Sequence, residues 1–164
     1  MDVYQGLRNQ LLDGTPAEFD LTPDELLPDV WATLTDMGMT AGIVTIICAG
    51  DGTASMYAST GGGFIGAGLH PPIVEATRNF LGSVQAHLDL LPVADAAPLP
   101  ETGRVAFVVL TYDGRMRRIE AAIEELGAEG HALFELWLNF NGVITQIRMA
   151  SAELDAQRKA EAGA

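Results

Sequence analysis

Residues 42–60 read GIVTIICAGDGTASMYAST, and this stretch decides the fold that the sequence predicts. Two apolar runs rich in β-branched residues flank the pair Asp51 and Gly52. An Asp-Gly pair is a strong hairpin signal, because both residues tolerate the positive φ of a two-residue turn. We therefore expect residues 43–49 and 53–59 to form antiparallel strands around a two-residue loop.

The same signal returns in residues 103–121, GRVAFVVLTYDGRMRRIEA. Here Asp113 and Gly114 separate an almost wholly apolar run, 105–112, from a run that carries three arginines. These residues predict a second hairpin. After each hairpin, apolar residues recur three or four positions apart, which predicts helices over 73–91 and 131–154. Gly142 and the asparagines beside it predict a kink or a break in the second helix.

Together these elements predict an α+β fold. We expect an antiparallel sheet of four or five strands, built from the two Asp-Gly hairpins, with helices packed on one face. Residues 105–110 are apolar at every position, so the central strands should be buried on both faces. The second face would then be covered by the N-terminal segment or by another subunit.

The chain divides into three parts by composition. Residues 1–29 form an acidic lead-in segment, residues 30–149 a single α+β domain, and residues 150–164 a C-terminal helical tail. In the lead-in, residues 22–25 read TPDE and match a capping box, which predicts a short helical turn. The apolar residues Val30, Trp31, Leu34 and Met37 predict a helical stripe that docks on the core.

Charge and composition exclude several classes of partner. The 22 acidic and 9 basic residues give a net charge of -13, which repels nucleic acids and anionic membranes. The single cysteine, Cys48, has no disulfide partner and lies in an apolar run. The N-terminus lacks the features of a signal peptide, and no apolar run reaches the roughly 18 residues of a membrane span. We expect a cytoplasmic protein.

Residues 59–72, STGGGFIGAGLHPP, form the main candidate site. Gly61, Gly63 and Gly66 fit the spacing of a dinucleotide fingerprint, but His70 and two prolines then separate them from the next helix. Prolines have no amide to offer a phosphate. We favour a short edge strand or bulge that bends into the next helix, consider a close backbone contact with another chain, and keep a ligand pocket as the alternative. The candidate ligand or contact residues are Ser59, Thr60, Gly61, Gly62, Gly63, Gly66, Gly68 and His70.

The histidines and arginines offer fewer candidate ligand sites than the glycine segment does. The three histidines are too far apart in sequence for a local metal motif, so we predict no metal site and no cofactor. Arg115 and Arg117 fall on one face of their strand and are a candidate anion site. Alternatively, their charges discourage unwanted pairing along an edge strand.

The order of the expected elements over residues 30–149 resembles that of roadblock and profilin-like domains, which serve mainly as small docking or dimerisation platforms. The chain departs from the roadblock pattern because residues 122–130 are too short and polar to supply the usual extra strand. In addition, the blocks GDGTASMYASTGGG, LTYDG, EELG and VITQIR resemble landmarks of a bacterial protein family without established activity. That likeness implies no catalytic residue.

Three hypotheses of function follow. The first is a non-enzymatic cytoplasmic module that associates with itself or with another protein, with the glycine segment near the contact. The second is a small enzyme or a binding domain for an anionic metabolite at residues 59–70. The third is an acidic inhibitor of a basic partner protein.

Overall fold

The structure, a computed structural model, describes residues 3–64 and 70–163. The predicted sites Gly66 and Gly68 lie outside the described residues. The elements in chain order are α1 (Val3–Leu12), η1 (Pro16–Phe19), β1 (Val30–Met39), β2 (Gly42–Ala49), β3 (Ala54–Ala58), β4 (Gly63–Phe64), α2 (Pro71–Ala86), η3 (Leu88–Leu90), β5 (Val93–Ala94), β6 (Arg104–Thr111), β7 (Met116–Ala122), α3 (Ile123–Leu126) and α4 (Phe134–Ala162).

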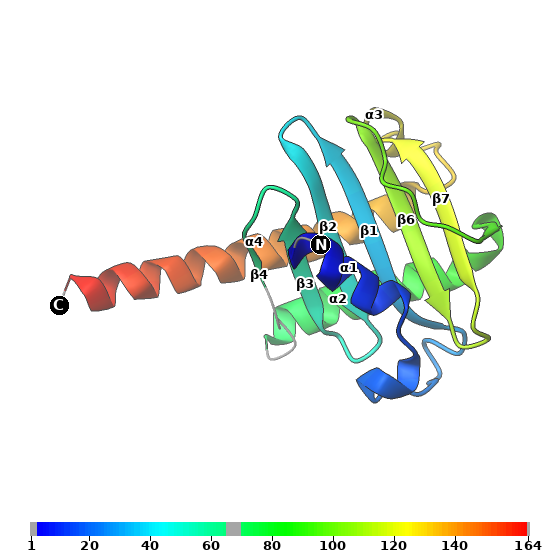
Figure 1. The fold of residues 1–164 in the computed structure, drawn as a ribbon, viewed down its shortest axis with the longest axis horizontal. Helices are drawn as coiled ribbons and strands as arrows, with labels where there is room; N and C mark the ends of the chain where they lie inside the picture. Colours follow the sequence, from blue (N-terminus) through cyan, green and yellow to red (C-terminus); the bar gives the residue numbers. More distant parts are fainter. Residues whose placement is uncertain (1–2, 65–69, 164) are drawn as a thin grey trace.

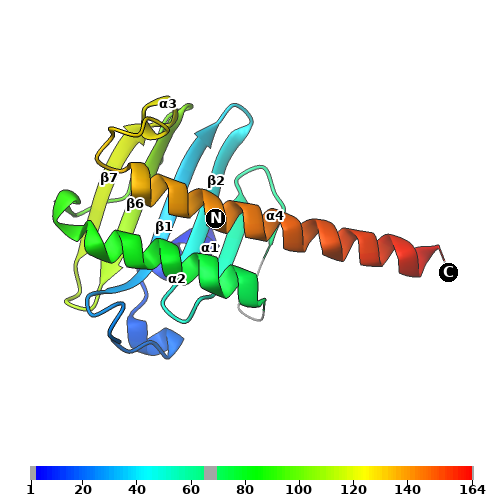
Figure 2. The same ribbon diagram turned by 180° about the vertical axis from the view of Figure 1, so that it is seen from behind.

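The described strands form one antiparallel sheet in the order β4-β3-β2-β1-β6-β7-β5. The predicted α+β fold is confirmed, but the sheet has seven strands instead of four or five. Two of them, β4 and β5, are only two residues long. Strand β4 lies at the edge of the sheet, where the glycine segment predicted a short edge strand or bulge, whereas β5 is too short to leave a pattern in the sequence. Helices α2 and α4 cover one face, and α1 lies across the other (Figures 1 and 2).

Strand β1 corrects the prediction of a helix over residues 30–37. It is the central strand and pairs with β2 on one side and β6 on the other, so that Leu34 lies between Ile47 and Val108. Nine of its ten residues are buried. A strand that is buried on both faces has no polar side, and its apolar residues therefore lack the alternation that identifies a strand.

Both predicted hairpins form, but each turn has three residues where we expected two. In the first turn, the amide of Ala49 donates to the carbonyl of Thr53 at 2.9 Å, and only Gly52 has a positive φ, at 92°. The Asp51 carboxylate accepts a hydrogen bond from the Thr53 amide at 2.9 Å. The second turn repeats this arrangement around Asp113 and Gly114. The aspartate therefore acts as an acceptor in the turn, and the glycine alone supplies the left-handed conformation.

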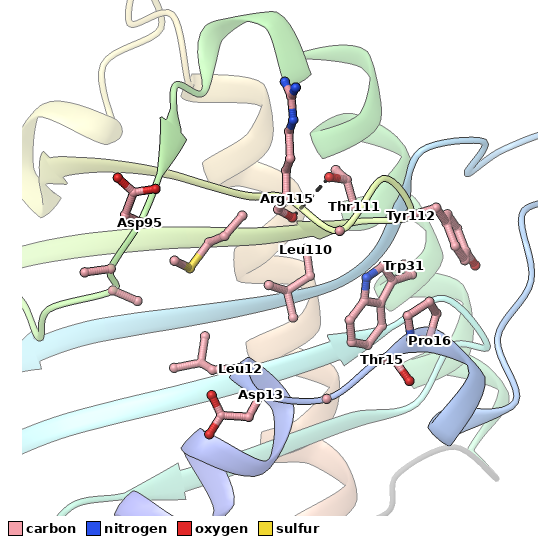
Figure 3. A pocket seen from close by; sticks show the side chains of 15 residues that line it. Leu12, Asp13, Thr15, Pro16, Trp31, Asp95, Leu110, Thr111, Tyr112 and Arg115 are labelled. Atoms are coloured by element: carbon pink, nitrogen blue, oxygen red, sulfur yellow. Dashed lines mark hydrogen bonds between the residues drawn. The ribbon is translucent and has the colours of Figure 1, made fainter.

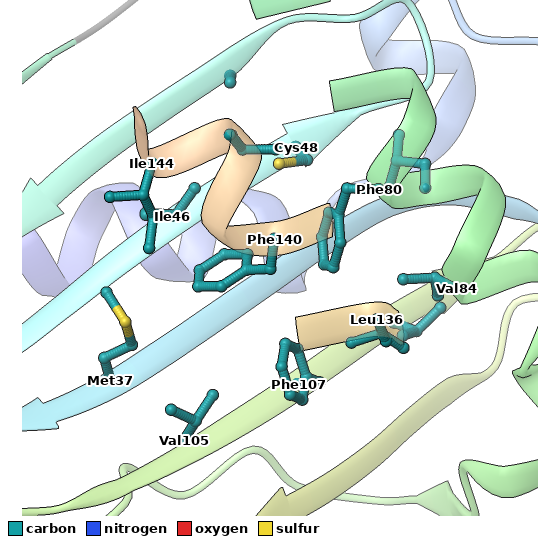
Figure 4. Packing of buried hydrophobic residues seen from close by; sticks show 14 of the residues in the cluster. Met37, Ile46, Cys48, Phe80, Val84, Val105, Phe107, Leu136, Phe140 and Ile144 are labelled. Atoms are coloured by element: carbon teal, nitrogen blue, oxygen red, sulfur yellow. The ribbon is translucent and has the colours of Figure 1, made fainter. Parts of the chain in front are cut away.

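The main core lies between the sheet and the two long helices (Figure 4). Its centre is formed by Phe80 of α2, Phe107 of β6 and Phe140 of α4, whose ring centroids are 5.2 to 6.3 Å apart. All three rings are buried. Aromatic rings at these separations bind one another through tilted and edge contacts as well as by burial.

Helix α4 is continuous from Phe134 to Ala162, so the predicted kink or break near Gly142 is wrong. Nothing lies within 4 Å of the position that a Cβ would take at Gly142. Gly142 therefore lowers the local helix propensity, but no adjacent atom in the described chain presses on the helix at this point to kink it. Packing of the apolar residues on either side of it outweighs the loss.

The N-terminal segment contains helix α1, which the sequence analysis missed. The capping-box pattern predicted at residues 22–25 produces no helix there; Thr15, Pro16 and Glu18 carry a second copy of that pattern and begin η1. Leu11 of α1 packs with Trp31 and Leu110 in a second apolar cluster on this face of the sheet. The N-terminal segment therefore covers part of the second face, as one of our two predictions stated.

Among the described residues, no helix combines the length and the apolar character that a membrane span requires.

Candidate functional site

The glycine turn joins β3 to β4 at one end of the sheet. The amide of Gly61 donates to the carbonyl of Ala58 at 3.0 Å, and the amide of Ala58 donates to the carbonyl of Gly62 at 3.2 Å. Gly61 and Gly62 have φ values of 105° and 82°, which other residues rarely adopt. A side chain at Gly63 would overlap the carbonyl oxygen of Met56 on the neighbouring strand. These glycines therefore permit a tight turn and a close backbone contact.

A hollow of about 450 Å³, the glycine hollow, lies between this turn and α1. Nine residues line it in the described part of the chain, and none of them is basic. Its walls are mainly the side chains of Val3, Tyr4, Leu7 and Tyr57. Val3 is 79% exposed. An apolar hollow with no positive charge is unsuited to a phosphate or a carboxylate, because either anion would lose its hydration without gaining a partner.

Of the other predicted residues, Ser59 and Thr60 line the glycine hollow, and His70 lines a different one. The Ser59 hydroxyl accepts a hydrogen bond from the amide of Ile43 at 2.9 Å, so it supports the β2–β3 pairing. Thr60 is exposed at the rim of the glycine hollow. His70 is the residue before α2, and its carbonyl accepts the amides of Ile73 and Val74 at 3.0 Å.

His70 lines a different hollow, of about 430 Å³, between the start of α2 and the middle of α4. This root hollow also contains Ile73, Gln146 and Met149. The side chain of Met149 is 61% exposed. Ser59, Thr60 and His70 therefore do not form the catalytic grouping that the enzymatic hypothesis requires.

Arg115 and Arg117 do not provide two free guanidinium groups for an anion. Arg117 donates through Nη1 to the carbonyls of Leu88 and Leu91, at 3.2 and 2.8 Å, and so ties β7 to η3. Arg115 is exposed, with its Nε 3.9 Å from the carboxylate of Asp113. Nor is β7 an edge strand along its first residues, because β5 pairs with Arg117 there. The edge-strand role that we considered for these arginines therefore does not apply to Arg117.

A third arginine of this strand takes part in an ion-pair cluster. Glu120 accepts from Nε of Arg104 at 2.9 Å and from Nη2 of Arg118 at 2.9 Å. The hydrogen bond from Arg104 lowers the pKa of Glu120 below its ordinary 4.5. Burial opposes this shift, and the hydrogen bond from Arg118 adds to the lowering. This cluster joins β6 to β7 and leaves its carboxylate ionised at neutral pH.

Sequence reasoning missed a buried ion pair beneath α1. Arg8 donates to Asp36 of β1 through Nη2 at 2.6 Å and through Nε at 3.3 Å. Arg8 is 5% exposed and Asp36 is fully buried. Asp36 also accepts the hydroxyl of Thr45 at 2.6 Å, and that hydroxyl lies 2.6 Å from the phenol oxygen of Tyr4.

This network fixes α1 on the sheet, and Arg8 extends it by donating to the carbonyl of Ala97 at 2.7 Å. Two features of the sequence could have revealed it. Asp36 is a charge inside an apolar strand, and Arg8 is the only base among the first 29 residues. Buried charges are rare unless they are paired, so each of these residues required a partner.

The most prominent surface feature is the end of α4. The last buried residue of this helix is Ala150, and residues 151–162, the α4 arm, continue beyond the body of the protein (Figures 1 and 2). The arm leaves the body at the end of the sheet formed by β3 and β4. Apart from the half-buried Ser151 and Leu154, its residues are exposed.

Comparison with protein-family models, with curated proteins and with solved structures gives no match for this chain.

Proposed function

We propose that the protein is a non-enzymatic cytoplasmic module that forms a homodimer through the α4 arm and the adjacent end of the sheet. The observation that carries this proposal is the end of α4 beyond Leu154, whose residues are all exposed in the described part of the chain. A helical segment of this length gains little stability from propensity alone and is usually stabilised by a packed face. A second copy of the chain would supply that face.

The distribution of charge along the chain favours a second copy of the protein as the partner that packs against the α4 arm. Nineteen of the 22 acidic residues and six of the nine basic residues precede Arg148, so the net charge of -13 lies entirely on residues 1–147. From Arg148 onward, three bases and three acids balance. Two copies repel one another through their bodies, and the neutral arm is where they approach at least cost. Asp155 and Arg158 stand three positions apart on one face of the arm, so that this face carries no net charge toward a second copy.

The surface beside the arm suits a two-fold contact. Leu138 and Met149 are 59% and 61% exposed and stand eleven positions apart, which places them on one outward stripe of α4. The root hollow next to Met149 would receive apolar side chains from the partner arm. A two-fold interface requires a surface that complements itself, and an arm beside a hollow has that form. The glycine turn at the end of the sheet would then lie close to the contact.

Light scattering coupled to size-exclusion chromatography tests this proposal. Removal of residues 151–164 should convert a dimer into a monomer, and Met149→Glu should weaken it at least tenfold by placing a charge in an apolar contact. Removal of residues 162–164 alone is the matched control and should leave the dimer intact. A dimer that survives the loss of the whole arm would refute the proposed interface, and a monomeric full-length chain would refute the proposed function.

A further inference from the structure

A hollow of about 420 Å³, the Trp31 hollow, lies on the α1 face of the sheet, away from the α4 arm. It opens between residues 12–16 and the β6–β7 turn, with the segment after β5 along one side (Figure 3). Its apolar walls are the side chains of Leu12, Leu110 and Met116. None of these residues takes part in the proposed dimer, so this site is independent of it.

Trp31 presents an unsatisfied hydrogen-bond donor to this hollow. The residue is 3% exposed, and its ring is stacked on Phe19 with centroids 5.9 Å apart. Among the residues that the structure describes, none accepts a hydrogen bond from the indole N–H. Figure 3 shows the indole nitrogen on the side of the ring that faces β6 and its turn. The indole nitrogen is not one of the side-chain atoms that are buried without a partner in the described chain, so it opens onto the hollow, where an acceptor from a ligand can reach it.

The rim of the hollow is acidic. Asp13 and Asp95 line it, both are exposed, and within the described chain neither forms an ion pair. Arg115 also contributes to the lining, but its guanidinium points away from the Trp31 ring (Figure 3). The entrance therefore favours a cation, in agreement with the charge of the whole protein.

We propose that the Trp31 hollow binds a lysine or arginine residue within a peptide segment of a basic partner protein. Such a residue carries the three groups that the hollow matches. Its aliphatic stem packs against Leu12, Leu110 and Met116, its cationic end lies near Asp13 and Asp95, and a carbonyl of its backbone accepts the indole N–H. A long side chain of this kind places its apolar stem and its charge in different surroundings.

Tryptophan fluorescence provides the assay. The chain has two tryptophans, so Trp137→Phe leaves Trp31 as the only reporter. The probes are the blocked tripeptides Ac-Ala-Lys-Ala-NH₂ and Ac-Ala-Arg-Ala-NH₂, with the norleucine tripeptide as the uncharged control and free lysine as the control without a peptide. We expect the basic tripeptides to change the emission of Trp31 and to bind at least fivefold more tightly than either control.

Surface variants identify the site, and one substitution within the second apolar cluster tests the hydrogen-bond donor. Asp13→Asn and Asp95→Asn should each weaken binding about two- to fivefold, as expected for exposed charge pairs, and added salt should weaken it further. Glu75→Gln on α2 removes the same charge from the opposite face and should have no effect. Trp31→Phe, followed by calorimetry, should weaken binding about fivefold through loss of the donor. Three results would overturn the proposal. They are equal affinity for the norleucine peptide or for free lysine, an equal loss of affinity with Glu75→Gln, and no binding of either basic tripeptide at 10 mM.

Discussion

Replacement of Arg8 by methionine should remove a large part of the stability of this fold. Methionine keeps much of the apolar stem of the side chain. It removes both hydrogen bonds from Arg8 to the fully buried carboxylate of Asp36, which keeps the hydrogen bond from the hydroxyl of Thr45. Breaking a buried ion pair by removal of one member costs about 3 to 5 kcal/mol. Since a domain of this size is stable by about 5 to 15 kcal/mol, the variant should unfold about 6 to 20 °C lower.

Urea unfolding followed by circular dichroism, at one fixed protein concentration, measures this loss. The matched control is Arg78→Met, because Arg78 bonds Asp24 at 3.0 Å where both side chains are partly exposed. Arg78 also donates to the carbonyl of Gly50 at 2.5 Å, so that change should cost about 1 to 2 kcal/mol, still below the loss expected at Arg8. The double variant Arg8→Met with Asp36→Leu should recover most of the loss, since an apolar pair removes the uncompensated charge. A cost below 1 kcal/mol for Arg8→Met, or no recovery in the double variant, would refute this reasoning.

Three further predictions concern single positions. Gly63→Ala should cost about 2 kcal/mol in urea unfolding, because its Cβ overlaps the carbonyl of Met56; an unchanged midpoint would contradict the close contact. The hydrogen bond from Arg104 lowers the pKa of Glu120, so its stabilisation is present above pH 4.5 and is lost as the pH falls. Glu120→Gln should therefore reduce the dependence of the unfolding free energy on pH below pH 4.5. An unchanged dependence on pH would contradict this role of Glu120. Burial raises the pKa of Cys48 to about 12, so a thiol reagent should label it only after unfolding, and rapid labelling of the native protein would be inconsistent with this.

Local signals in the sequence predicted the two hairpins, because an Asp-Gly turn depends on residues that are adjacent in the chain. They failed for β1, where burial on both faces removes the polar alternation, and for α1, which is held mainly by tertiary contacts. Arg8 and Asp36 are 28 positions apart in the sequence, and no local pattern predicts a contact between residues so far apart. Asp36, a lone charge among apolar residues, could have revealed that a partner had to exist, but we did not draw that inference from the sequence.

The candidate site was predicted in part. The tight glycine turn follows from the tolerance of glycine for positive φ, and the structure places Gly61 and Gly62 beside a hollow whose described lining has no basic residue. The character of that hollow depends on Val3 and Tyr4, which approach from the other end of the chain. The Trp31 hollow likewise combines four distant segments, so its composition could not be read from any single stretch.

The distance between two arms tests the central claim most directly. Gln157→Cys places a reactive thiol on the α4 arm for a spin label, while the buried Cys48 stays unlabelled. Asp89→Cys places the same label in η3, beyond the far end of α2 from the arm (Figure 2). Pulsed electron paramagnetic resonance should find a short intermolecular distance at residue 157 and a longer one at residue 89. The absence of intermolecular coupling at residue 157, or a shorter distance at residue 89, would contradict association through the arm.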